Sequence, residues 1–460
     1  APYKPVIYNE LEEKKEPQMM LREYQKEAIE NLKKNKWQGI FAMATGTGKT
    51  FTALYALKNF LNQRKNGLII IVCPYTHLVT QWEKEVLKVF SYQKIVKCFE
   101  NRNNWADKID LLIREILLNK ILGICITTIS TGSKETFLKK LCNTNIEKFI
   151  VFDEVHNIGS KESKKMLEIE AAFRLGLSAT PIRRYDEEGN RAILKYFGKV
   201  VYEFSLKEAI LQGYLAKYNY FLMFCELSDD EQEKYEKITK QIINQMNKKE
   251  ADEDLIQILL NKRVKIISAC KDKLIKLDYL LKKSKFKKTI FYTAEDKEFF
   301  KLTREVLNKN GIVTLNITSK ENYFKREKII EDLVEDKIDG ILAMRCLDEG
   351  ADIPEVENAI ILASSSNSKQ YIQRRGRVLR KKNKNENKVA KIYDYIVIPR
   401  EMRSDIEKSI FTRELKRIKE FIECAENKNE IILKLLKFSY NNACMKEFIK
   451  LLEGEENEQK

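Results

Sequence analysis

The octapeptide MATGTGKT at residues 43–50 decides the fold, because an apolar run precedes it and a helical pattern follows it. Glycines at positions 46 and 48 allow backbone N–H groups to curl around phosphate oxygens with no Cβ in the way. We expect a strand over residues 39–43 and a helix over residues 51–60, whose N-terminus adds partial positive charge. The octapeptide therefore predicts a phosphate-binding loop between a strand and a helix.

The side chains of this loop suit a nucleoside triphosphate. Lys49 is expected to reach the β- and γ-phosphates, and the Thr50 hydroxyl is expected to ligate Mg²⁺. The strict pattern has glycine where this chain has Met43, so the loop alone is an incomplete match. The candidate nucleotide-binding residues of the loop are Thr45, Gly46, Thr47, Gly48, Lys49 and Thr50.

A second motif, KFIVFDEVH at residues 148–156, places two carboxylates at the end of an apolar run. Beside the phosphate loop, Asp153 would hold Mg²⁺ through water, and Glu154 would orient and deprotonate the attacking water. Adjacent acids at a strand end are often only turn residues. His156 is one of two histidines in the chain, and its interest as a catalytic candidate depends on its place in DEVH.

The chain alternates short β-branched runs with amphipathic helical stretches, which predicts parallel α/β sheets. The first set of expected strands covers residues 39–43, 68–73, 123–127, 149–152 and 175–177. The second set covers residues 289–292, 313–317, 340–343, 359–363 and 392–397. Since open α/β sheets bind ligands at the carboxyl ends of their strands, we expect the motifs to meet there.

Between the two sets of strands, residues 228–283 are rich in Lys and Glu, contain no Pro or Gly, and have helical spacing. Residues 401–450 show a helical pattern again, before a charged tail. The resulting division is an N-terminal extension, a first α/β lobe, a helical connector, a second α/β lobe and a helical C-terminal segment. These five parts cover residues 1–20, 21–205, 206–284, 285–400 and 401–460.

Bulk composition fits a globular chain of about two to four domains, with 43% hydrophobic and 33% charged residues among 460. The chain has 84 Lys and Arg against 68 Asp and Glu, which gives a formal charge of +16. Such an excess favours polyanionic partners such as nucleic acid. The alternative is that solvated helix faces are simply lysine-rich.

The nine cysteines include no CxxC pair, which argues against zinc ribbons and iron–sulfur clusters and favours reduced thiols in the cytoplasm. The longest uninterrupted apolar run, residues 67–73, is far shorter than the ~20 residues that cross a bilayer, so we expect no membrane partner. The chain begins with Ala and not with Met, which leaves open whether it is a processed chain or a segment excised from a longer one.

The motifs MATGTGKT, DEVH, LSATP and QRRGRVLR occur in an order that resembles the superfamily 2 helicases of the DExH-box type. The phrases LREYQKEAI and RLGLSATPIRR are similar to the branch that contains XPB-like helicases and the motors of type I and III restriction enzymes. The resemblance extends from about residue 21 to residue 399. It implies two tandem RecA-like lobes, with ATP and Mg²⁺ bound between them, and a nucleic-acid track.

Carried over by position, the resemblance implies roles for several residues of the first lobe. Gln25 would read the adenine edge, since an amide pairs with both a donor and an acceptor, and Arg22 would flank the base. Ser178, Ala179 and Thr180 of LSATP would couple hydrolysis to movement between the lobes.

In the second lobe, the spacing in YIQRRGRVLR implies the other half of the nucleotide site. Gln373 would approach the γ-phosphate, and Arg377 and Arg380 would be arginine fingers, whose guanidinium groups stabilise the charge of the transition state. In LDEGADIP, Gly350 and Asp352 would contact the ribose.

The nucleic-acid contacts that the resemblance implies are weaker assignments, because this chain has Met344 where many superfamily members have threonine. Backbone amides and small hydroxyl residues suit phosphate oxygens, which carry no sequence information. The candidates are Pro74, Thr127, Thr128, Thr131, Thr318, Ser319 and Arg326. Two basic stretches, residues 282–288 and 380–388, either extend this contact or are solvated loops.

We therefore expect an ATP-dependent nucleic-acid translocase or helicase. DNA is favoured over RNA by the XPB-like and restriction-enzyme branch alone, which is an analogy. A second hypothesis is the motor of a restriction, repair or phage-defence complex whose nuclease lies elsewhere, since histidine occurs only at positions 77 and 156 and no nuclease pattern is seen. A third hypothesis, an inactive clamp, is disfavoured because every ATP-site residue is present.

Overall fold

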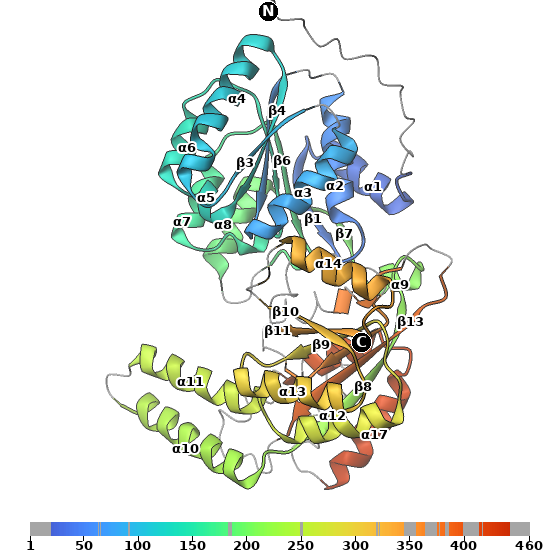
Figure 1. Cartoon of the computed structure of the whole chain (residues 1–460). Helices are drawn as coiled ribbons and strands as arrows, with labels where there is room; N and C mark the ends of the chain where they lie inside the picture. The colour runs from blue at the N-terminus through green and yellow to red at the C-terminus, as the bar shows by residue number, and fades with distance from the viewer. Residues whose placement is uncertain are drawn as a thin grey trace, which may run out of the picture.

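A computed structural model of the chain describes residues 20–62, 64, 66–90, 93–182, 186–248, 252–318, 321, 323–344, 356–363, 375–376, 378–381, 386–398, 414–415 and 417–441. Two parallel β-sheets flanked by helices form two lobes, one above the other in Figure 1. The predicted fold class, two tandem RecA-like lobes, is confirmed.

The first sheet has seven strands in the order β3-β4-β2-β5-β6-β1-β7, and every neighbouring pair is parallel. The strands are β1 (Gln38–Met43), β2 (Gly67–Cys73), β3 (Lys94–Cys98), β4 (Leu122–Thr128), β5 (Lys148–Phe152), β6 (Phe173–Ser178) and β7 (Val200–Phe204). The five predicted strands are confirmed as β1, β2, β4, β5 and β6. The two edge strands, β3 and β7, were not predicted.

Alternation along each central strand sends side chains to two separate cores. In β2, Ile69 and Ile71 pack with one group of helices, and Leu68 and Ile70 pack with the other. The first group is α1 (Glu23–Lys34), α2 (Lys49–Leu61) and α3 (Thr76–Val89). The second group is α4 (Ala106–Asn119), α6 (Glu135–Cys142) and α8 (Glu187–Phe197). Because both faces are covered, the loops at the carboxyl edge of the sheet carry the site.

The second sheet has six parallel strands in the order β10-β11-β9-β12-β13-β8. The strands are β8 (Lys217–Cys225), β9 (Thr289–Thr293), β10 (Thr314–Ile317), β11 (Gly340–Met344), β12 (Asn358–Ile361) and β13 (Val389–Val397). Residues of α12 (Asp272–Lys283) and α13 (Lys297–Lys309) share a core with Phe291 and Leu342. Residues of α14 (Tyr323–Val334) and α17 (Lys428–Asn441) share a core with Ile290 and Ile341.

The structure corrects one part of the predicted helical connector. Strand β8 lies within residues 206–284 and pairs in parallel with β13, so the second sheet receives its edge strand before the connector helices. The helical stretch expected over residues 228–283 is present as α10 (Asp229–Met246), α11 (Glu253–Ser268) and α12. Helices α10 and α11 pack together and project from the second lobe (Figure 1). The domain boundaries themselves stay predictions.

Short elements complete the described chain. They are α5 (Ile129–Gly132), α7 (Lys161–Lys164), α9 (Leu206–Leu211) and the 3-10 turns Arg102–Asn104, Val155–Asn157 and Lys165–Glu168. Among the helices that the structure describes, none has the length and apolar character needed to span a bilayer.

Candidate active site between two lobes

Strand β1 extends to Met43, the position at which the strict phosphate-loop pattern has glycine. Met43 ends β1 and is completely buried in the core, which explains why this position carries a large apolar side chain. Gly46 and Gly48 have φ values of 90° and 80°, in the left-handed region that glycine adopts without a steric penalty. The Thr47 hydroxyl donates to the Ala44 carbonyl oxygen at 2.7 Å and closes the turn.

The loop fits a triphosphate on two observations of this structure. The Thr45 hydroxyl is buried and makes no hydrogen bond within the described part of the chain, so it is a polar group that a ligand could satisfy. A Cβ added to Gly48 would lie 3.0 Å from Gln25 Nε2, and the φ of 80° would strain any other residue, so glycine keeps the backbone of the loop accessible at this position. Lys49 and Thr50 are the first two residues of α2, directly after the loop, and both are half-buried.

The acidic box lies against the loop, as predicted. Lys49 Nζ lies 3.3 Å from Glu154 Oε1 and links the two motifs. Asp153 is buried behind this pair, and its Oδ2 accepts a hydrogen bond from the indole nitrogen of Trp82 at 2.9 Å. Burial, and then the charge of Glu154, raise the pKa of Asp153 to about 6, while the Trp82 hydrogen bond and Lys49 oppose this rise.

His156 connects the acidic box to LSATP. Its Nδ1 lies 2.8 Å from Ser178 Oγ and 3.4 Å from Glu154 Oε2, and the side chains of His156 and Ser178 are buried. Thr180 N donates to the same Ser178 oxygen at 3.0 Å. Glu154 itself has a φ of 46°, a left-handed conformation that costs a non-glycine residue energy and that occurs often at functional sites. The predicted catalytic and coupling residues of the first lobe therefore form one connected polar group, which includes Lys49, Glu154, His156, Ser178 and Thr180.

The adenine-side candidates lie at the start of α1. Gln25 is buried, and its Oε1 accepts a hydrogen bond from Arg22 N at 2.9 Å. The Arg22 guanidinium lies 5.1 Å from the centre of the Tyr214 ring. Tyr24 was not predicted, yet its hydroxyl donates to the Thr47 carbonyl oxygen at 2.5 Å and ties α1 to the phosphate loop.

The second lobe reaches the loop through the segment that carries the predicted arginine fingers. A Cβ added to Gly46 would lie 3.0 Å from the Gly376 carbonyl oxygen and 3.4 Å from Arg380 Cγ. A Cβ added to Gly376 would lie 2.6 Å from Thr45 Cβ. Burial lowers the pKa of Arg380 to about 10, which still leaves the guanidinium charged at neutral pH. Gln373, Arg377, Gly350 and Asp352 lie outside the described residues.

Most nucleic-acid candidates lie at or shortly after the carboxyl ends of strands, but the hydroxyls of Thr127, Thr128 and Thr318 have partners within the protein. Thr127 is completely buried and donates to the Cys98 carbonyl oxygen at 2.8 Å. Thr128 Oγ accepts from Thr131 N at 3.3 Å, and Thr131 is buried.

In the second lobe, the Thr318 hydroxyl donates to Glu321 Oε2 at 2.7 Å, and Arg326 donates to the Thr318 carbonyl oxygen at 2.9 Å. Pro74 directly follows β2 and is half-buried, and Ser319 lies outside the described residues. The nucleic-acid roles of all these residues stay predictions.

Comparison with known proteins gives matches in both lobes. Residues 18–183 match the family model of the type III restriction enzyme res subunit, and residues 272–382 match the helicase conserved C-terminal domain. The DNA 3'-5' translocase XPB2 of Sulfurisphaera tokodaii is 27% identical over 388 residues, which are 79% of this chain and 79% of the relative. The putative DNA 3'-5' helicase Rad25 of Haloarcula marismortui is 23% identical over 364 residues, which are 79% of this chain but 51% of the relative.

Among solved structures, the ATP-dependent type ISP restriction-modification enzyme LlaBIII bound to DNA shares the fold with a TM-score of 0.62 and 17% identity. The match covers 90% of this chain and 30% of that enzyme. The two family models lie in the same order as the two sheets, and each carries one side of the candidate site. The chain therefore belongs to superfamily 2 of the helicases.

Proposed function

We propose that this chain is a translocase that hydrolyses ATP between its two lobes and moves along DNA. The observation that carries the proposal is the meeting of Gly376 and Arg380 of the second lobe with Thr45 and Gly46 of the phosphate loop. A nucleotide held by the loop would lie where residues from both lobes can reach it.

The residues of the site divide the chemistry of phosphoryl transfer. Glu154, held by Lys49 at 3.3 Å, would accept a proton from the attacking water, and Arg380 would stabilise charge on the γ-phosphoryl oxygens. Thr50 and Asp153 would hold Mg²⁺, which supplies positive charge to the phosphate oxygens when bound. Gln25 and Arg22 would bind the base.

Movement follows from a site shared by two lobes. The group formed by Glu154, His156 and Ser178 joins the attacking-water position to the strand end of LSATP. A change in the position of Glu154 on hydrolysis would therefore move the LSATP loop at Ser178 and Thr180. The two lobes would close when ATP binds and separate after hydrolysis.

DNA is the track we favour, because the names of the XPB2 and Rad25 relatives specify DNA. Because the chain has a formal charge of +16, its binding to DNA should weaken steeply as the salt concentration rises, as it does for proteins that contact phosphates through Lys and Arg. RNA is the alternative track. A cytoplasmic location stays a prediction.

A second candidate role is the motor of a larger enzyme. The chain matches 30% of a restriction-modification enzyme and about half of the Rad25 relative, so related motors occur within longer proteins. In that role, the output would be the activity of a nuclease elsewhere in the assembly.

The test measures phosphate release with single-stranded DNA, duplex DNA and RNA of matched length. We expect DNA to stimulate the rate more than RNA does. Lys49→Ala should abolish the stimulated rate while the protein stays folded by circular dichroism, because the loop loses its only charged side chain. A folded Lys49→Ala protein with near-normal turnover would contradict the proposed chemistry. DNA binding without stimulated release would indicate an inactive clamp.

A further inference from the structure

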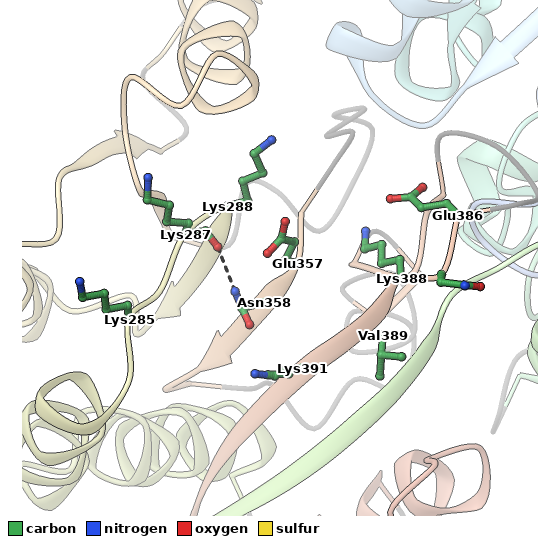
Figure 2. A pocket seen from close by; sticks show the side chains of 10 residues that line it. Lys285, Lys287, Lys288, Glu357, Asn358, Glu386, Lys388, Val389 and Lys391 are labelled. Carbon is green, nitrogen blue, oxygen red and sulfur yellow. Dashed lines mark hydrogen bonds between the residues drawn. The ribbon is translucent and has the colours of Figure 1, made fainter.

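Two lysine-rich stretches that are far apart in the sequence come together on the second lobe. Residues 285–288 and 386–391 line an open cavity of about 530 Å³ at the start of three strands (Figure 2). Five of its ten lining residues are lysines, namely Lys285, Lys287, Lys288, Lys388 and Lys391. The cavity has the size of a small-ligand pocket and a strongly basic lining.

The fold holds the backbone of this pocket in place. Lys288 immediately precedes β9, and its carbonyl oxygen accepts a hydrogen bond from Glu357 N at 2.9 Å. Asn358, the first residue of β12, donates its side-chain amide to the Lys287 carbonyl oxygen at 2.9 Å, as Figure 2 shows. Lys288 has a φ of 47°, a left-handed conformation that costs a non-glycine residue energy and that recurs at ligand sites.

The charges of the lining favour an anion. Glu357 and Glu386 are the acidic lining residues, so five lysines against two glutamates leave a net charge of +3. The side chains of Lys285, Lys287 and Lys391 are exposed, and none of them takes part in an ion pair of the described residues. Ammonium groups donate hydrogen bonds in any direction and fit phosphate oxygens as point charges.

The pocket lies at the opposite edge of the sheet from the predicted track. Its residues precede β9, β12 and β13, whereas the track candidate Thr318 follows the carboxyl end of β10. Strand β9 has five residues, so the two edges are separated by roughly 17 Å. One bond connects the pocket to the nucleotide site, because Lys388 Nζ donates to the Arg380 carbonyl oxygen at 2.8 Å.

We propose that this pocket binds phosphate groups of a nucleic-acid segment that lies outside the track between the lobes. The inference rests on the proposed function, which supplies the polyanion. A second contact would keep the motor on its substrate while the lobes open. Through the bond from Lys388 to Arg380, a phosphate bound in the pocket would also affect the nucleotide site. Contacts of this kind carry no sequence information and depend steeply on salt.

The test neutralises the three exposed lysines in the variant Lys285→Gln, Lys287→Gln, Lys391→Gln. Affinity is measured against salt concentration with a duplex of about 40 base pairs and with one of about 10 base pairs that fills only the track. We expect the slope of log affinity against log salt to become shallower by about 2 to 3 on the long duplex and to stay unchanged on the short one.

The matched control is Lys108→Gln, Lys139→Gln, Lys195→Gln, which removes the same charge from exposed positions on α4, α6 and α8 of the first lobe. This control should keep the wild-type slope on both duplexes. Equal slopes for the pocket variant and the control on the long duplex would overturn the inference. A loss on the short duplex as well would place the lysines on the track and would also overturn it.

Competition by poly-glutamate with the wild type, lost in the pocket variant without any change in DNA binding, would assign the pocket to an acidic protein and overturn the inference. The two proposals fail separately. If no nucleic acid stimulates wild-type phosphate release, the proposed function fails. If stimulation is present and the pocket variant keeps the wild-type slope, only the pocket inference fails.

Discussion

At the scale of single residues, Trp82 is the clearest addition to the expected site. Its indole N–H donates to Asp153 Oδ2 at 2.9 Å, and this bond lowers the pKa of a carboxyl group that burial raises. We infer that Trp82 is a positioning residue, which holds one carboxylate oxygen and keeps Asp153 ionised for a metal ion.

We predict that Trp82→Phe raises the Mg²⁺ concentration needed for half-maximal phosphate release about 10-fold, since loss of a partner behind a metal ligand has effects of this size. The rise should be larger at pH 6 than at pH 8, because Asp153 loses a bond that lowers its pKa.

The control for Trp82→Phe is Trp105→Phe. Trp105 is equally buried, and its indole nitrogen has no hydrogen-bond partner within the described part of the chain. The same loss of volume there should leave the Mg²⁺ dependence unchanged. Equal Mg²⁺ curves for the two variants would exclude the positioning role.

Asp153 also makes the nucleotide-free protein sensitive to pH. Its pKa is about 6 in the folded state, against 3.8 for an ordinary aspartate, so its contribution to stability is full below about pH 4 and is lost as pH rises through about 6. We predict that Asp153→Asn is more stable than the wild type at pH 8, by on the order of 1–3 kcal/mol, and that the difference vanishes near pH 4. Thermal melts without nucleotide at both pH values check this, and a less stable variant at pH 8 would contradict it.

At the scale of elements, the start of α1 is attached to the phosphate loop. The Tyr24 ring stacks on Phe204 of β7 with centroids 4.2 Å apart, and its hydroxyl donates to the Thr47 carbonyl oxygen. The helix that carries Gln25 and the loop that carries Lys49 are therefore held in one arrangement.

We predict that Tyr24→Phe raises the KM for ATP by about 2- to 10-fold. The lost hydrogen bond contributes about 0.5–1.5 kcal/mol to the stability of the loop conformation that binds the nucleotide. Tyr395→Phe removes a buried hydroxyl that has no hydrogen-bond partner among the described residues, and it should leave KM unchanged. If both variants show the wild-type KM in steady-state assays, the bond does not contribute to nucleotide binding.

The strands that the sequence predicted include the central ones of both sheets and one edge strand, β10. Strand β2, GLIIIVC, is buried at every position and is apolar throughout, which is typical of a parallel sheet. The edge strands β3, β7 and β8 were not predicted. Strand β3 reads KIVKC, and its exposed lysines flank only two apolar residues, so it forms no apolar run of strand length. Strand β8 contains the apolar run YFLMFC at residues 220–225, but this run lies inside the segment that we expected to be a helical connector.

For the site, the sequence indicated which residues lie together where their motifs are local, while their roles stay predictions. Gly46, Lys49, Asp153 and Glu154 belong to short motifs whose spacing specifies their role, and the structure brings them together. The partnership of Trp82 with Asp153 spans 71 residues and leaves no local pattern. It depends on α3 packing over β2 and β4, next to β5 in the sheet, which only the folded arrangement reveals.

At the scale of the whole molecule, two of the contacts between the lobes lie within the described residues that carry the site or flank it. Gly376 packs against the phosphate loop, and Lys84 of α3 forms an ion pair with Glu327 of α14 at 2.5 Å. The ion pair is largely exposed, so we expect it to contribute less than about 1 kcal/mol. The close approach of Gly376 to Thr45 leaves no space for a side chain, and we infer that it limits how nearly the lobes can close.

We predict that Gly376→Ala lowers kcat for phosphate release about 10- to 100-fold without unfolding either lobe. The added methyl would lie 2.6 Å from Thr45 Cβ, so the lobes must separate, and a shift of about 1 Å at a reacting site can cost 100-fold. Gly311→Ala is a control for backbone strain alone: its methyl meets nothing within 4 Å, and its φ of 71° costs the variant stability, but kcat should stay unchanged. Wild-type kcat in folded Gly376→Ala would show that this contact is not needed for catalysis.

The central claim is that ATP turnover between the lobes drives movement along DNA. Displacement of a fluorescent third strand from a DNA triplex tests this most directly, because it reports translocation whether or not the duplex is opened. The account predicts that the wild type displaces the third strand only with ATP and Mg²⁺, and that Lys49→Ala displaces none while still binding the duplex. ATP hydrolysis stimulated by duplex DNA, with no displacement at any concentration of enzyme, would contradict it.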